Sequence, residues 1–222
     1  GTLSGLAYDI VEQMGKDMGV KIAWVEEVGP GTMLEGLQAN RYDMVCNPLW
    51  ATTPRVRIAA YTAPLFFTAV NAYGRNDDHR FYGKLELANA PTVTIATIDG
   101  GTASQIAGED YPLAKLDSLP EMTDFSHLLL EVQTGKADLT FSEAAQFAVF
   151  SANNPGTLRN LTPEKPVRLV ANDFPVRGDE TRLLAAVNTA LTNLRYSGFV
   201  DRTLSRYEPA PGVWRRVALP YQ

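Results

Sequence analysis

Two side chains of opposite charge, Arg55 and Glu143, each follow a segment with the pattern of a helix end, a turn and a strand. The segments, residues 37–45 and 132–140, share an apolar residue and Gln, a turn with a basic residue, and Asp before a short strand. This echo predicts two similarly built α/β halves that present polar residues at strand ends, where open α/β sheets bind ligands. A cation on one half could therefore face an anion on the other.

The residues that other chemistries need are few and scattered. His79 and His127 are the only histidines, they lie far apart in sequence, and neither is near Cys46. A metal site and a Ser-His-Asp triad are therefore not expected, because both need such side chains to come together. No phosphate-binding loop or dinucleotide fingerprint is found either. We predict no catalytic residue, no metal and no cofactor.

The composition is that of an ordinary globular protein. A length of 222 residues is enough for two domains of about 100 residues each. A formal charge of −5 argues against nucleic acid or an anionic membrane as a partner. The longest apolar stretch, residues 59–70, is interrupted by Thr62 and Pro64 and is too short to span a bilayer.

Helix and strand patterns alternate along the chain, which predicts an α/β fold with largely parallel sheets. Asp9 is the expected N-cap of the first helix, which Gly19 ends. The other predicted helices cover residues 33–38, 125–133, 144–150 and 183–198, and one more opens at residues 100–105. The predicted strands cover residues 21–25, 43–47, 66–73, 91–97 and 138–141, with a linker at 75–80 and a return crossing at 167–179.

Six motifs resemble those of the family 3 extracellular solute-binding proteins in order and spacing. They are residues 1–10, 42–55, 61–66, 100–104, 135–143 and 186–199. The resemblance covers about residues 1–207 and implies a class II periplasmic-binding-protein fold of the amino-acid-binding type. In such a fold two lobes, joined by two crossing strands, close on a ligand like a Venus flytrap. Lobe one would hold residues 1–70 and 175–222, and lobe two residues 76–168.

The resemblance also implies ligand contacts. Arg55 matches the Arg that grips the ligand carboxylate, a task that suits the planar guanidinium fork. Glu143 matches an acidic residue, usually Asp, that takes the α-ammonium group. Thr102, Ala103 and Ser104 match a loop that adds backbone N–H and hydroxyl donors at a helix N-terminus.

Asn47 and Thr52 would line the same mouth, and Trp50 departs from the family pattern there. Where the amino-acid binders usually have Ser or Thr, five residues before Arg55, this chain has Trp50, and Pro48 replaces a small residue. A hydroxyl contact to the carboxylate is lost. The indole could stack on a flat or cationic ligand, or it could fill the core.

Each of these positions also has a purely structural interpretation. Arg55 could form a surface salt bridge, Glu143 could complement a helix dipole, and the Gly-Gly-Thr motif at residues 100–102 could be a turn and cap. Asp43 and Asp138 of the echo are interpreted as structural.

The C-terminus carries the pattern of a strand that the family has at the beginning. Residues 215–222 read as basic, apolar and small residues, then Pro and an aromatic residue, and they follow the breaker at 209–212. We expect this segment to insert as the missing first strand of lobe one, as in a circular permutant, with Tyr221 near the cleft. A swapped dimer or a second, truncated module are the alternatives.

The resulting hypothesis is a periplasmic or extracellular binding protein of an ABC importer. Its partners would be an amino acid or related small carboxylate and a membrane permease, and it would be a monomer. Two alternatives remain open: an enzyme resembling the cyclohexadienyl dehydratases, with Glu143 as general acid, and the sensor domain of a membrane receptor or kinase.

Overall fold

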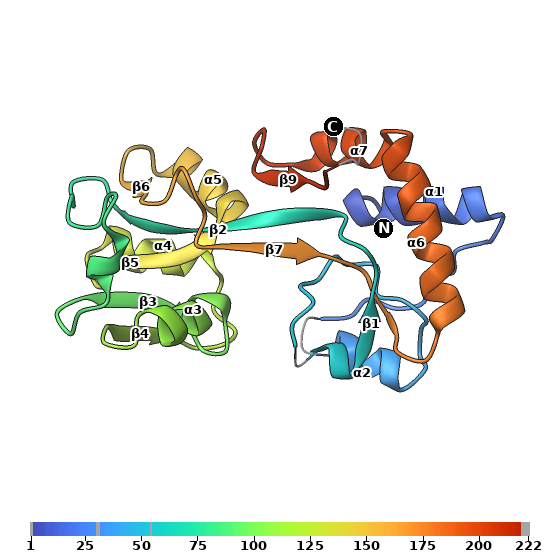
Figure 1. Cartoon of the computed structure of the whole chain (residues 1–222), viewed down its shortest axis with the longest axis horizontal. Helices are drawn as coiled ribbons and strands as arrows, with labels where there is room; N and C mark the ends of the chain where they lie inside the picture. The colour runs from blue at the N-terminus through green and yellow to red at the C-terminus, as the bar shows by residue number, and fades with distance from the viewer. Residues whose placement is uncertain (1, 30–31, 54, 219–222) are drawn as a thin grey trace. The chain divides into compact units, whose positions relative to one another are not determined.

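The computed structural model describes residues 2–29, 32–53 and 55–218, and it divides into two compact units. The first unit joins residues 1–67 to 170–222, and the second holds 68–169. The chain passes between them twice, within strands β2 (Phe66–Arg75) and β7 (Arg168–Asn172), which pair with each other (Figure 1). The mixed α/β class predicted from the sequence is confirmed.

Three helices form the main core of the first unit. They are α1 (Leu6–Met18), α6 (Thr181–Tyr196) and α7 (Phe199–Tyr207), and each packs against the other two. Each helix turns an apolar stripe inward, as helical spacing requires. The buried residues of these stripes are Ile10, Val11, Met14, Val187, Ala190, Leu191, Leu194, Val200 and Leu204.

Helix α1 ends where the sequence predicted but begins earlier. Gly19 adopts a left-handed backbone with φ 68°, which glycine reaches without a Cβ penalty. The N-cap is Gly5, so the prediction of Asp9 is wrong. Asp9 lies in the first turn, where its carboxylate accepts hydrogen bonds from Arg206 at 2.9 Å and Tyr207 at 3.0 Å of helix α7.

The first unit has little regular sheet. Strands β1 (Ala59–Tyr61) and β8 (Pro175–Arg177) pair antiparallel, and α2 (Met33–Gln38) packs beside them. The strand predicted at residues 43–47 is reduced to one bridge between Met44 and Val176. The strand predicted at 21–25 has no regular structure. A strand forms only where a neighbour accepts its backbone hydrogen bonds, and this segment has none among the described residues.

The second unit is built on a mixed sheet. Strand β3 pairs parallel with β4 and β5, whereas β2 pairs antiparallel with β5 and β6. The expectation of largely parallel sheets is therefore correct for β3 and wrong for β2. These strands are β3 (Thr94–Ile98), β4 (Lys115–Leu119), β5 (Leu139–Glu143) and β6 (Leu158–Asn160). The helices are α3 (Thr102–Asp110), α4 (Ser126–Gln133) and α5 (Ala144–Asn153). Two short 3-10 helices are also found among the described residues, η1 (Arg55–Arg57) in the first unit and η2 (Leu85–Ala88) in the second.

Asp138 has the structural role expected of it. Its carboxylate accepts a hydrogen bond from the backbone N–H of Thr94 at 2.8 Å and forms an ion pair with Arg80 at 2.5 Å. These contacts hold the start of β5 against β3. Asp43, its counterpart in the first unit, is exposed and contacts Arg177 at 3.3 Å.

The C-terminal segment departs from the predicted insertion over its described part. Strand β9 (Trp214–Arg216) pairs with β2, so Arg215 and Arg216 do not join the sheet of β1 and β8. The Trp214 ring packs on Phe66 with centroids 4.9 Å apart. Arg216 is held by Asp201 at 2.6 Å and Glu208 at 3.0 Å, which fixes β9 in this place. Tyr221 lies outside the described residues.

Candidate ligand-binding site

The loop that precedes η1 carries the predicted ligand-binding residues of the first unit, Asn47, Trp50 and Thr52. Leu49 anchors this loop, because its N–H donates to the Asp173 carbonyl at 2.8 Å and its carbonyl accepts from Asp173 N–H at 3.2 Å. Thr52 accepts a backbone hydrogen bond from Val56 at 3.0 Å, which turns the chain into η1. Trp50 and Thr52 are half-buried.

Arg55 is the charged group of this loop. Its Nη1 donates to the Trp50 carbonyl at 3.1 Å, which uses one of the five N–H donors of the guanidinium. No carboxylate of the described residues pairs with it. Arg55 is half-buried, so an anion bound there would be partly shielded from water and held by charge-assisted bonds.

Near Arg55 lies a group of polar side chains that the sequence did not reveal, namely Tyr61, Asp173 and Arg195. Burial raises the pKa of the Asp173 carboxyl to about 6, and the nearby charge of Arg195 opposes that shift. Burial also raises the pKa of Tyr61, and the charge of Arg55 opposes this. The Tyr61 hydroxyl and one Asp173 oxygen have no hydrogen-bond partner within the described structure. A lone Asp in a return crossing is usually exposed, so no sequence signal marks this one.

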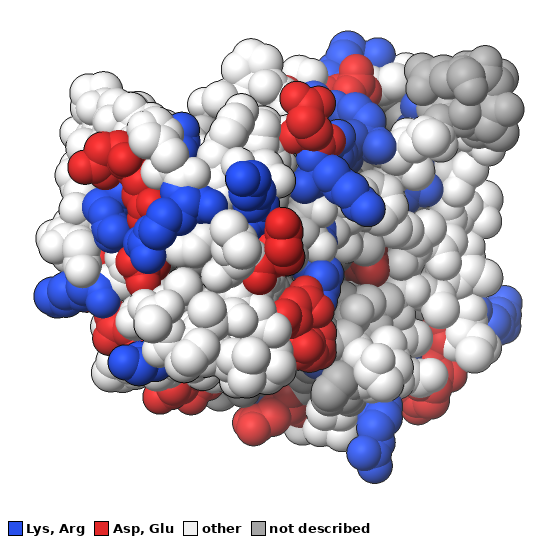
Figure 2. Space-filling model, turned by 60° about the vertical axis from the view of Figure 1, so that its left-hand side comes forward, with Lys and Arg blue, Asp and Glu red and all other residues white. Residues whose placement is uncertain are grey.

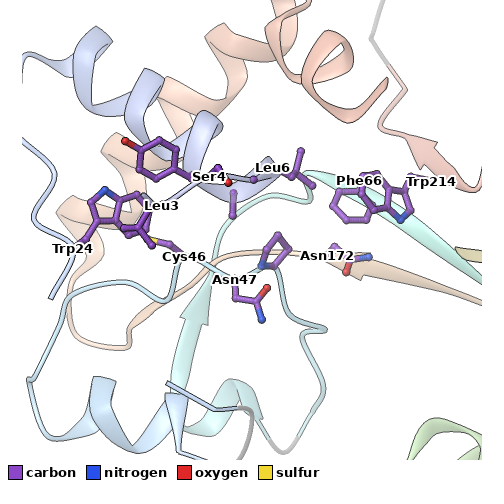
Figure 3. A pocket seen from close by; sticks show the side chains of 13 residues that line it. Leu3, Ser4, Leu6, Trp24, Cys46, Asn47, Phe66, Asn172 and Trp214 are labelled. Carbon is purple, nitrogen blue, oxygen red and sulfur yellow. The ribbon is translucent and has the colours of Figure 1, made fainter. Parts of the chain in front are cut away.

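A pocket of about 420 Å³ lies within the first unit (Figure 3). Asn47 is the predicted site residue that lines it, whereas Trp50, Thr52 and Arg55 do not. None of the lining residues is charged. They are Leu3, Ser4, Gly5, Leu6, Ala7, Tyr8, Trp24, Cys46, Asn47, Pro48, Phe66, Asn172 and Trp214.

Glu143 ends β5 and stands at the N-cap of α5 in the second unit. Its side chain makes no capping hydrogen bond, and no cation of the described residues pairs with it. Burial raises the pKa of its carboxyl to about 7. A helix N-terminus favours the ionised form, so desolvation outweighs the helix dipole at this position.

An aromatic pair lies near Glu143. Tyr73 of the neighbouring strand lies close enough for Glu143 to contribute to the raised pKa of its hydroxyl, which reaches about 12 mainly through burial. The Tyr73 ring stacks on Phe147 of α5 with centroids 4.1 Å apart. A cationic group reaching Glu143 would restore the charge that this apolar setting disfavours.

The first turn of α3 supplies hydrogen-bond donors. Thr102, Ala103 and Ser104 open this helix, and the first N–H groups of any helix lack intrahelical acceptors. Two glycines shape the approach. Gly100 has φ 69°, and a Cβ on Gly101 would lie 3.0 Å from the Ile98 carbonyl oxygen.

The register of the sheet brings Glu143 and the first turn of α3 to the same edge of the second unit's sheet. Strands β3 and β5 are parallel, with Ile95 beside Leu139 and Ala96 beside Thr140. Three residues further on, β3 leads into the glycine turn and α3, and β5 leads to Glu143. A carboxylate and a helix N-terminus therefore share the carboxyl edge of one sheet, the place where such sheets bind ligands.

The described residues contain no group of His, Cys, Asp and Glu side chains that could hold a metal ion. No described helix is both long and apolar enough to cross a membrane. Acidic and basic side chains are interspersed on the face shown in Figure 2, unlike the extended basic surface that binds a phosphate backbone.

Residues 1–210 match the family described as bacterial extracellular solute-binding proteins, family 3. The chain belongs to this family. A probable histidine-binding protein of Campylobacter jejuni is 22% identical to this solute-binding protein over 209 residues, which are 93% of this chain and 77% of the relative.

Solved structures show the same fold. A putative binding component of an ABC transporter from Wolinella succinogenes, complexed with lysine, has a TM-score of 0.78 at 18% identity and covers 94% of this chain and 87% of its own. An ancestral amino acid-binding protein, described as a precursor of cyclohexadienyl dehydratase, has a TM-score of 0.71 at 22% identity with the same coverage. This solute-binding protein therefore has the class II periplasmic-binding-protein fold.

Proposed function

We propose that this solute-binding protein binds an amino acid or a related small carboxylate as the receptor component of an ABC importer. Arg55 of the first unit would bind the carboxylate, and Glu143 of the second would bind the ammonium group. One observation carries the proposal: each of these charged side chains lacks an ion-pair partner in the described structure, although each is half-buried. Charged groups in such places are normally paired, so a ligand with both charges fits them.

The remaining predicted contacts support the same ligand class. The first-turn N–H groups of residues 102–104 stand at the same sheet edge as Glu143. They would donate to the ligand carboxylate or to its side chain. Asn47, Trp50 and Thr52 would contact the ligand from the first unit. Names of relatives include histidine-binding and lysine-complexed proteins, so these two amino acids are the first to test.

The location and partner follow from the same proposal. A receptor of this family would work in the periplasm or outside the cell, and it would deliver its ligand to a membrane permease. We expect a monomer, because a single chain carries both proposed charge partners.

Calorimetry with a panel of amino acids tests the proposal. Arg55→Ala should weaken binding of the best ligand by about 30-fold or more, since losing one partner of a buried charge pair costs about 2–5 kcal/mol. Arg57→Ala is the matched control, because this arginine is exposed in the same 3-10 turn and should bind as wild type. Equal affinities for all three proteins would refute the assignment of Arg55.

An enzymatic function is the second candidate, and the raised pKa of Glu143 favours it. A carboxyl with a pKa of about 7 can serve as a general acid near neutral pH. The similarity to a precursor of cyclohexadienyl dehydratase points to the substrates to try. Incubation with prephenate and arogenate decides the matter: repeated turnover that Glu143→Gln abolishes would establish the enzyme, and its absence supports binding alone.

A further inference from the structure

The hydroxyl of Tyr73 ends a chain of hydrogen bonds within the second unit. The backbone N–H of Ala72 donates to the Thr162 hydroxyl at 3.2 Å, and that hydroxyl donates to the side-chain oxygen of Asn71 at 3.3 Å. The side-chain nitrogen of Asn71 then donates to the Tyr73 hydroxyl, also at 3.3 Å. The Tyr73 oxygen is therefore an acceptor in this chain, and its own proton can be donated elsewhere. No acceptor among the described residues takes that proton.

The Tyr73 hydroxyl is buried, so its missing acceptor has an energetic cost. Tyr73 is 1% exposed and Asn71 6%. A buried hydroxyl that donates to nothing has lost the hydrogen bond that it makes with water in the unfolded chain. The ring is held in place, because it stacks on Phe147 with centroids 4.1 Å apart. The hydroxyl is thus fixed in position with one donor to offer.

The register of the sheet places this donor beside Glu143. Asn71 of β2 lies opposite Ser142, the residue that precedes Glu143 on β5. Because the Tyr73 hydroxyl reaches back along β2 to Asn71, it lies at the end of β5 where Glu143 stands. The Ser142 hydroxyl at this end is already used, since it donates to Gln146 at 2.8 Å. The charge of Glu143 also acts on Tyr73, whose pKa it helps to raise.

The other charged or titratable groups of the elements that pack against β5 have partners of their own. Helix α5 and strand β3 carry no such side chain. Those of α3, α4 and β2 are Glu109 and Asp110, which pair with Arg168; Glu131, which pairs with Lys136; His127, which contacts the Asp124 carbonyl; and Arg75, which pairs with Asp78 and Asp138. Of the titratable groups on these described elements, Tyr73 is the one left to interact with Glu143.

We propose that Tyr73 positions Glu143 by donating a hydrogen bond to its carboxylate once that group is ionised. One carboxylate oxygen then accepts from the hydroxyl, and the other is free for the ammonium group of the ligand. The bond is charge-assisted and favours the ionised form of Glu143. Tyr73 acts through Glu143 and does not touch the ligand. The importance of the bond for ligand binding rests on the function proposed above, whereas the bond itself does not.

The pKa of Glu143 in the unliganded chain tests the bond. It is measured by NMR of carbon-13-labelled carboxyl groups, with Glu143→Gln to assign the signal. Tyr73→Phe should raise this pKa by about half a unit or more, because the ionised carboxylate loses its donor. Tyr111→Phe is the matched control and should leave it unchanged. Tyr111 is also buried and also stacks on a phenylalanine, but its hydroxyl lies near the charges of Asp110 and Arg168. An unchanged or lower pKa in Tyr73→Phe overturns the proposal.

Replacement of Tyr73 by 3-fluorotyrosine keeps the proposal testable if Tyr73→Phe fails to fold. The fluorinated phenol has nearly the same shape and is a stronger donor, so it should lower the pKa of Glu143. A role of Tyr73 in packing alone predicts no such fall. The same pKa as in the wild type would therefore refute the hydrogen bond.

Calorimetry with histidine and lysine separates this inference from the proposed function. If either amino acid binds, Tyr73→Phe should weaken its binding by about threefold or more at pH 6. The loss should shrink at pH 8.5, where Glu143 ionises without help from the hydroxyl. Equal affinities of the wild type and Tyr73→Phe at pH 6 would refute the positioning role. If neither amino acid binds while Tyr73→Phe still raises the pKa of Glu143, the hydrogen bond stands and these two ligands are wrong.

Discussion

The guanidinium of Arg55 donates from Nη1 to the backbone carbonyl of Trp50, 3.1 Å away. The bond ties the proposed carboxylate-binding side chain to Trp50, which the resemblance places where the amino-acid binders usually have Ser or Thr. Because the acceptor is the main chain, replacing the Trp50 side chain leaves the bond intact. The indole can therefore be changed without releasing Arg55.

Trp50 should report ligand binding by fluorescence. It lies between Asn47 and Arg55 in the loop that we assign to the ligand, so binding should quench or shift its emission. Trp50→Phe should abolish the signal, whereas Trp24→Phe and Trp214→Phe should retain it, because these two line the uncharged pocket instead. If the full signal survives in Trp50→Phe, the loop is not at the ligand.

Stability should fall as the pH rises from about 4 to 7. Burial raises the pKa of Glu143 to about 7 and of Asp173 to about 6, so the folded protein holds protons that the unfolded chain has released. Their contribution is complete below the unfolded pKa values and is lost above the folded ones.

Urea unfolding at pH 5 and pH 8 measures this loss. In Glu143→Gln the free energy of unfolding should change by about 1–3 kcal/mol less between the two pH values than in the wild type. Asp173→Asn should reduce the same pH dependence over a lower pH range. Parallel profiles for wild type and Glu143→Gln would show that Glu143 is ionised in the unliganded protein at both pH values.

Ligand binding should release a proton at pH 6. An ammonium group at Glu143 requires the ionised carboxylate, whereas the unliganded carboxyl is largely protonated there. Affinity should therefore increase between pH 5 and pH 8. Calorimetry in buffers of different ionisation enthalpy measures the number of protons released on binding. The variant Glu143→Gln should bind the ligand weakly and release no proton. An unchanged proton count in that variant would place the released proton elsewhere, with Asp173 as the next candidate.

The glycines around α3 should respond in opposite directions to alanine. Gly100→Ala should destabilise the protein by about 1 kcal/mol or more, because its φ of 69° is unfavourable for a residue with a Cβ. Gly108→Ala, inside the same helix, should stabilise by about 0.5–1 kcal/mol, because a Cβ there meets no atom within 4 Å. Chemical denaturation compares the two. Equal effects would show that the positive φ of Gly100 carries no such cost.

The second unit follows from local sequence patterns more closely than the first. Strands β3 and β5 and the helices after them lie within a few residues of their predicted bounds, because each strand has a neighbour and each helix has one apolar face. Residues 21–25 have an equally good strand pattern but no partner for their backbone, so the strand does not form. Periodicity describes a segment's own preference and cannot show whether its neighbour is present.

The candidate site also contains some residues that the sequence predicts and others that only the structure reveals. Arg55 and Glu143 are predicted from the sequence, because the resemblance to family 3 solute-binding proteins points to them. The surroundings of Asp173 could not be, because its burial depends on Tyr61 and Arg195, which lie far away along the chain. Desolvation is a property of the packed structure, so pKa shifts of this kind have no local sequence signal.

The division of the chain into units has a consequence for its synthesis. The second unit is continuous, from residue 68 to residue 169, whereas the first is completed only by residues 170–222. Helices α6 and α7, which supply much of the first unit's core, leave the ribosome only after the whole second unit. We expect the second unit to fold while translation continues, whereas the apolar stripe of α1 stays uncovered until α6 and α7 have been made. The early part of the first unit is therefore the part most exposed to aggregation and to chaperones until those helices have been made.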